Sequence, residues 1–124
     1  MQLPKTFHWK KQRKGSRCCG QIAVSIILNK SLSATFELFG KNKCTETKDL
    51  IRVLRKQNIK CSDKLKRKMS SKLAIAKLKY PNKTCWHWVV IHNKKIYDGI
   101  YGKRDGTVKW KKTWRITSYL EIYP

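Results

Sequence analysis

Three residue types that can do chemistry together occur in a suggestive chain order. Cys19 begins a Cys-Gly-Gln turn ahead of an apolar run, His87 lies in a second apolar run, and Asp98 closes a third. A cysteine at a helix start experiences the positive end of the helix dipole, which lowers its pKa and favours the thiolate. An imidazole beside it can hold the thiol proton, and a carboxylate can orient the imidazole. This order predicts a thiolate nucleophile.

An acyl-transfer site also needs hydrogen-bond donors for the oxyanion that forms during the reaction. The backbone N–H of Cys19 is one candidate, and the side-chain amide of Gln12 in the preceding loop is the best second one. Asn93 is the alternative to Asp98 as the residue that orients the imidazole. We interpret the adjacent Cys18 as a neighbour of the nucleophile rather than the nucleophile itself.

The elements that must position these residues follow from the apolar periodicity. Helices are predicted at residues 19–29, at 33–39 before a Gly40 stop, and from a Thr47 cap to about residue 57. Strands are predicted at residues 59–61, 73–80, 86–92, 95–97, 107–110 and 118–123, with Asn93-Lys94 as a hairpin turn and residues 63–71 as a basic loop or helical turn. Helices followed by an antiparallel sheet define an α+β fold class.

The charge of the chain is the second strong feature. Lys and Arg number 30 against 7 Asp and Glu, a net charge of +23. Such an excess predicts a polyanionic partner, either nucleic acid, an acidic membrane surface or an acidic protein. The densest basic run, Lys64, Lys66, Arg67 and Lys68, is the candidate nucleic-acid contact. A solvated loop, and lysine used as a general surface residue, are the simpler interpretations.

Length and cysteine usage limit the other classes. The 124 residues predict one domain over residues 1–124, with residues 1–17 as a basic N-terminal loop segment. Five cysteines without a regular framework argue against a secreted disulfide scaffold, and no metal-ligand spacing occurs, so neither metal nor cofactor is expected. We expect no signal peptide and no membrane span, and therefore a cytoplasmic location in the producing cell or in a target cell.

The motifs resemble a known family. Gln12, Cys-Gly-Gln-Ile-Ala at residues 19–23, His-Trp-Val-Val at 87–90 and Tyr-Asp-Gly at 97–99 are similar to papain-like cysteine peptidases of the bacteriocin-processing, double-glycine-leader type and their small stand-alone bacterial relatives. The likeness covers most of residues 12–123. It implies a papain-like fold in which N-terminal helices pack on a C-terminal antiparallel sheet. It also implies that Cys19 is the nucleophile, His87 the base, Asp98 the orienting residue and Gln12 the oxyanion donor.

Two positions depart from the pattern of that family. Its glutamine usually lies six residues before the cysteine, whereas Gln12 lies seven before Cys19 and six before Cys18. Either the loop carries one extra residue or Gln12 is not the donor. Gly99 follows Asp98 where proline is commoner, which is a mild change.

The expected function is a papain-like cysteine peptidase or related thiol-dependent acyl hydrolase that cleaves a peptide or isopeptide bond in a peptide or protein substrate. Small size and high charge suit a mobile-element, phage or inter-bacterial effector protein, for which an immunity partner is conceivable. The alternative is a basic nucleic-acid-binding protein or toxin-like nuclease on the same fold. On that alternative Cys19 and His87 are packing residues and Asp98 is a turn residue. Tryptophans between basic residues then either stack on bases or fill the core.

Overall fold

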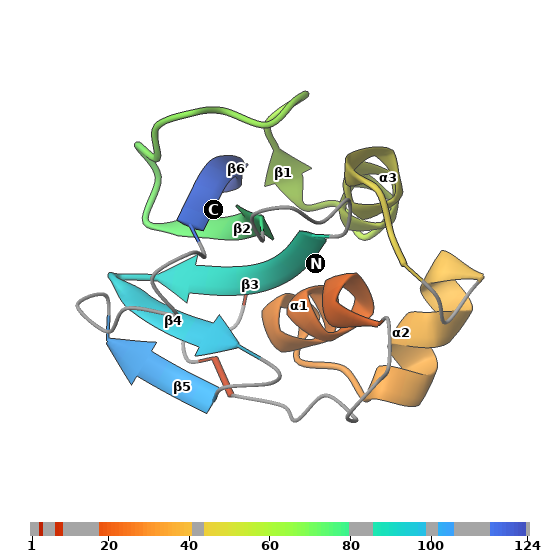
Figure 1. The fold of residues 1–124 in the computed structure, drawn as a ribbon. Helices are drawn as coiled ribbons and strands as arrows, with labels where there is room; N and C mark the ends of the chain where they lie inside the picture. Colours follow the sequence, from red (N-terminus) through yellow and green to blue (C-terminus); the bar gives the residue numbers. More distant parts are fainter. Residues whose placement is uncertain are drawn as a thin grey trace.

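The computed structural model describes residues 3, 7–8, 18–40, 44–79, 86–98, 102–105 and 115–123, without the side chains of residues 98 and 102–105. Among these described residues, three helices precede six strands (Figure 1). The helices are α1 (Cys19–Leu28), α2 (Leu32–Phe39) and α3 (Thr47–Lys56). The strands are β1 (Lys60–Cys61), β2 (Leu73–Lys79), β3 (Trp86–His92), β4 (Lys95–Asp98), β5 (Gly102–Asp105) and β6 (Arg115–Tyr123). The predicted α+β class is confirmed.

Local sequence signals explain the helix ends. Ser31 caps α2 by accepting a hydrogen bond from the Ala34 N–H at 3.1 Å, and Gly40 ends it at a φ of 73°. The N-cap of α3 is Glu46, not Thr47 as the sequence suggested, because the side chains of Glu46 and Asp49 form a reciprocal capping box. The ends of the three helices otherwise lie within one residue of the predicted ones.

The sheet is antiparallel throughout, in the order β1-β6-β2-β3-β4-β5. Asn93 and Lys94 join β3 to β4 with φ angles of 48° and 68°, so the predicted tight hairpin is confirmed. Strand β5 was not predicted, since Gly-Lys-Arg-Asp lacks apolar alternation, and β6 begins at Arg115 rather than Ser118. The predicted strand at 107–110 lies outside the described residues.

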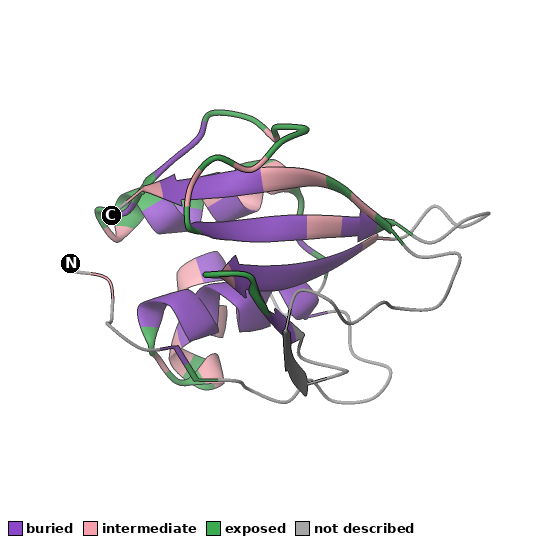
Figure 2. Ribbon diagram, turned by 90° about the vertical axis from the view of Figure 1, so that its left-hand side faces the viewer, coloured by how far each residue is buried: buried purple, intermediate pink, exposed green. Residues whose placement is uncertain are grey.

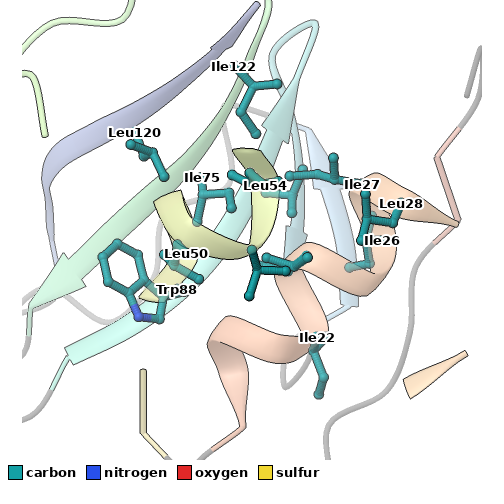
Figure 3. Close-up of a cluster of buried hydrophobic side chains, with 14 of the residues drawn as sticks. Ile22, Ile26, Ile27, Leu28, Leu50, Leu54, Ile75, Trp88, Leu120 and Ile122 are labelled. Atoms are coloured by element: carbon teal, nitrogen blue, oxygen red, sulfur yellow. The ribbon is translucent and has the colours of Figure 1, made fainter. Parts of the chain in front are cut away.

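The core has two unequal parts on the two faces of the sheet. Helices α1 and α3 cover one face, and α2 packs on both helices (Figure 1). Figure 3 shows apolar side chains of α1 and α3 meeting those of β2, β3 and β6, among them Ile26, Leu54, Ile75, Trp88 and Leu120. The opposite face carries a smaller cluster of Ala76, Val89, Ile91 and Ile96. Strand β3 is therefore buried on both faces (Figure 2).

Within the described part of the chain, no single helix has the length and apolarity to cross a membrane. Only α1 and α2 taken together meet that test, and the pair is bent by 113°.

Candidate functional site

The start of α1 holds the predicted nucleophile in a tightly packed setting. Cys18 is the N-cap and Cys19 the first helical residue, with relative exposures of 4% and 9%. Behind the thiol, Gly20 packs directly against the loop before α3. A Cβ atom at Gly20 would lie 1.8 Å from Thr45 Oγ1 and 3.2 Å from Trp88 Cδ1. Only glycine fits here, because any larger residue would push α1 away from Thr45 and the sheet.

Thr45 also anchors two tryptophans of β3. Its carbonyl oxygen accepts hydrogen bonds from the indole Nε1 of Trp86 at 3.2 Å and of Trp88 at 3.1 Å. Lys77 on the neighbouring strand lies with its Nζ 4.8 Å from the Trp86 ring centroid and 5.8 Å from that of Trp88. All these groups lie on the α1 side of the sheet, and they fix which way the start of β3 faces.

His87 lies between these two tryptophans, and the strand pleat turns it the other way. Successive strand residues point to opposite faces. Trp86 and Trp88 face α1, and His87 therefore shares the other face with Val89 and Ile91. It is 3% exposed and pairs across the sheet with Leu78. Helix α1 and strand β3 lie side by side (Figure 1), and alternation along β3 places His87 on the sheet face opposite the one that Trp88 presents to α1.

The other two predicted site residues can be placed only in part. Asp98 is the last residue of β4, and the register Val90↔Tyr97 puts the backbone position of Asp98 beside Val89. Since alternate residues of a strand share a face, position 98 lies on the same face as Ile96, which is also the face of position 87. The side chain of Asp98 and the whole of Gln12 lie outside the described residues.

The basic run lies in a second region, β1 together with the segment that joins it to β2, which we call the basic segment (residues 60–72). Lys66 exchanges two backbone hydrogen bonds with Tyr119 of β6, at 2.8 and 2.7 Å. The Ser62 N–H donates to the Glu121 carbonyl oxygen at 2.9 Å, and the Ser62 hydroxyl donates to the Lys64 carbonyl oxygen at 2.9 Å. These bonds hold the segment along the sheet edge although few apolar side chains anchor it.

A buried carboxylate completes that anchoring. The side chain of Glu121 is fully buried, and its Oε1 accepts hydrogen bonds from the Ser70 hydroxyl at 2.8 Å, from the Ser71 N–H at 3.1 Å and from the Ser70 N–H. Its Oε2 accepts from the Tyr123 hydroxyl at 2.9 Å and lies 3.3 Å from Lys66 Nζ. Burial raises the pKa of Glu121, but the hydrogen bonds from Ser70, Ser71 and Tyr123 outweigh it and hold that pKa at about 2. Sequence reasoning missed Glu121, although an acid between Leu120 and Ile122 in a basic chain was a visible signal.

The four predicted nucleic-acid contacts differ in availability. Lys66 is engaged by Glu121 and donates to the Tyr123 hydroxyl at 3.1 Å. Lys64, Arg67 and Lys68 are exposed, and no acid among the described residues pairs with them. Three of the four cations therefore point to solvent from a segment that Lys66 and Glu121 hold in place.

The remaining cysteine and histidine side chains that the structure describes include Cys44, Cys61 and His92. Cys44 is exposed and Cys61 is buried, and burial raises the pKa of the Cys61 thiol. His92 is half-buried on the α1 face with its ring 4.7 Å from that of Phe7. In the described ranges no three His, Cys, Asp or Glu side chains gather closely enough to hold a metal ion.

The chain was also compared with known proteins. No protein-family model matches it, and no curated protein matches it significantly.

Proposed function

We propose that the protein binds nucleic acid through the basic segment, mainly by contacts from lysine and arginine to phosphates. The observation that supports this best is the ordered presentation of cations: six of the thirteen residues 60–72 are Lys or Arg and one is acidic. All six basic side chains are exposed. A nucleic-acid strand offers phosphates in a regular row, and cations fixed in one segment match such a row with less ordering cost than a flexible tail.

The net charge of +23 supports the same proposal at longer range. It attracts any polyanion, raises the association rate and makes the binding depend on salt. Contacts to phosphates carry no sequence information, so we expect little discrimination between sequences.

The test is a salt titration of the affinity for a short labelled duplex, measured by fluorescence anisotropy. The wild type should lose affinity linearly on a log–log plot, with a slope of about 0.9 for each phosphate neutralised. Replacing Lys64, Arg67 and Lys68 by Gln should lower that slope by roughly 0.9 for each phosphate that the variant no longer neutralises. A matched control with Lys56, Lys94 and Lys95 replaced by Gln removes the same charge from exposed positions elsewhere.

Three outcomes would overturn the proposal. The first is no binding by the wild type at low salt. The second is an equal change of slope in both triple variants, which would mean that net charge alone attracts the duplex. The third is equally effective competition by poly-glutamate, which would identify an acidic protein as the partner.

A second candidate function is thiol-dependent hydrolysis of a peptide or related acyl bond in a papain-like arrangement. The observation that favours it is the place of Cys19 as the first residue of α1, with no acid in the first helical turn to oppose a thiolate. Here Cys19 is the nucleophile, His87 the base, Asp98 the orienting residue and Gln12 the oxyanion donor.

Thiol reactivity tests this second function. In a Cys44→Ser background, which removes the one exposed thiol among the described residues, iodoacetamide should modify Cys19 much faster at neutral pH than the buried Cys61. His87→Ala should remove that difference, and Cys18→Ser should leave it intact. Equal, slow modification of Cys19 and Cys61 would eliminate the hydrolase candidate and would leave the nucleic-acid proposal unaffected.

A further inference from the structure

The described residues line a cavity that is open to solvent on the α1 side of the sheet, away from the basic segment. Its volume is about 370 Å³, and its walls are Glu46, Thr47, Lys48, Lys77 and Trp86. It lies between the start of α3 and the strand ends where β2 finishes and β3 begins. That volume is in the range of pockets that hold small organic groups.

The walls of this cavity are fixed in advance. The Trp86 indole is held by its hydrogen bond to the Thr45 carbonyl, and the Lys77 ammonium lies between the Trp86 and Trp88 rings at 4.8 and 5.8 Å from their centroids. A preformed aromatic wall with a positioned cation loses little conformational entropy when a ligand binds.

The charged residues at the cavity favour a ligand with a negative charge, and the Trp86 ring favours a ligand that also has a planar group. The carboxylate of Glu46 is occupied, since it accepts the Asp49 N–H in the capping box and pairs with Lys48 at 3.4 Å. No acid in the described ranges lies within ion-pairing distance of Lys77. Burial first, and then the charge of Lys79, lowers the pKa of Lys77, and the charge of Glu46 partly opposes this; an anionic ligand would stabilise the charged form of Lys77.

We propose that this cavity binds one nucleotide of an unpaired strand, with the base stacked on Trp86 and a phosphate on Lys77. The proposal rests on the nucleic-acid function proposed above and adds a preference for single strands. Every base offers a stacking surface, so the site tolerates any sequence, but a base inside a duplex is already stacked and cannot enter.

The experiment compares a labelled single-stranded oligonucleotide with a duplex of the same length, at one salt concentration. The wild type should bind the single strand more tightly. Trp86→Leu should weaken single-strand binding about tenfold and leave duplex binding unchanged, whereas Trp86→Phe, which keeps a ring, should retain most of it. Lys77→Gln should weaken single-strand binding several-fold. Lys79→Gln, which removes an exposed charge two residues further along β2, is the matched control.

The outcomes separate the two proposals. If the wild type binds nucleic acid but Trp86→Leu binds the single strand as well as the wild type does, the cavity proposal is wrong and the function stands. Equal losses for both ligands in Trp86→Leu and Trp86→Phe would mean that Trp86 only supports the fold, which also overturns it. Failure of the wild type to bind either ligand overturns the function itself.

Discussion

The start of α1 and the basic segment are held in place by opposite means. At the α1 start, Gly20 lets the helix backbone press against Thr45 and Trp88, so close packing fixes the position. In the basic segment, hydrogen bonds from two serines, a tyrosine and a lysine converge on the carboxylate of Glu121. Close packing does not depend on pH, whereas a carboxylate network does. The two regions should therefore fail under different perturbations.

The largest effect is expected for Glu121→Gln. A neutral amide cannot pair with Lys66, and its NH₂ group would face donors that the carboxylate now satisfies. Glu121 is the buried partner and Lys66 is exposed, so the loss comes mainly from the Ser70 and Ser71 donors left unsatisfied, at about 1–3 kcal/mol of unfolding free energy each. Urea unfolding measures this loss. Glu37→Gln, at an exposed acid on α2, is the control and should change stability by less than about 0.5 kcal/mol.

Acidification should reproduce that loss in the wild type. The pKa of Glu121 falls from an ordinary value of 4.5 to about 2 on folding. A depressed carboxyl pKa stabilises the fold above the ordinary value, and this stability is lost as the pH falls from about 4.5 through about 2. The shift corresponds to about 3 kcal/mol at neutral pH. Glu121→Gln should remove this part of the acid dependence, and an unchanged acid profile in that variant would contradict the role of Glu121.

Gly20→Ala tests the packed region and should cost somewhat less. The new Cβ would overlap Thr45 Oγ1, and overpacking of this kind costs about 1–3 kcal/mol, of which the better helix propensity of alanine returns up to about 1 kcal/mol. We expect a net loss of about 2 kcal/mol in urea unfolding, equal at neutral and acidic pH. Adding Thr45→Ala should recover part of it, because Thr45 Oγ1 has no hydrogen-bond partner among the described residues. A loss of stability that changes with pH would contradict the prediction that close packing, independent of pH, holds the start of α1 in place.

Local signals in the sequence predicted most elements. Gly40 ends α2 because glycine adopts a positive φ at little cost, and Asn93-Lys94 forms a tight hairpin because both residues take positive φ. The helix over residues 19–29 was equally clear from its apolar run. These signals are local, so a single sequence contains them.

Which side chains of β3 point towards α1 could not be predicted in the same way. Strand periodicity predicts that His87 and Trp88 point to opposite faces of the sheet. It predicts which of the two residues faces the helix only when one face of the strand is polar. Both faces of β3 are buried, and so are all five consecutive residues from His87 to Ile91. What settles the choice is the bond of Trp88 to the Thr45 carbonyl, a contact between residues 43 positions apart. The predicted meeting of Cys19 and His87 depended on this non-local detail.

The smallest expected effect concerns His92, on the same face of β3 as the tryptophans. Its ring lies edge-on to Phe7, and burial, followed by the charges of Lys95 and Lys72, lowers its pKa below 6.5. A histidine pKa lowered on folding stabilises the fold above about pH 6.5, and this stability is lost as the pH falls towards the folded value. NMR titration of the ring should therefore give a pKa below the ordinary value of 6.5. Phe7→Leu should raise the pKa of His92 towards that ordinary value, because a smaller neighbour admits water to the imidazole. A His92 pKa at or above 6.5 would mean that the ring is solvated, and the packing of Phe7 against this end of β3 would then be wrong.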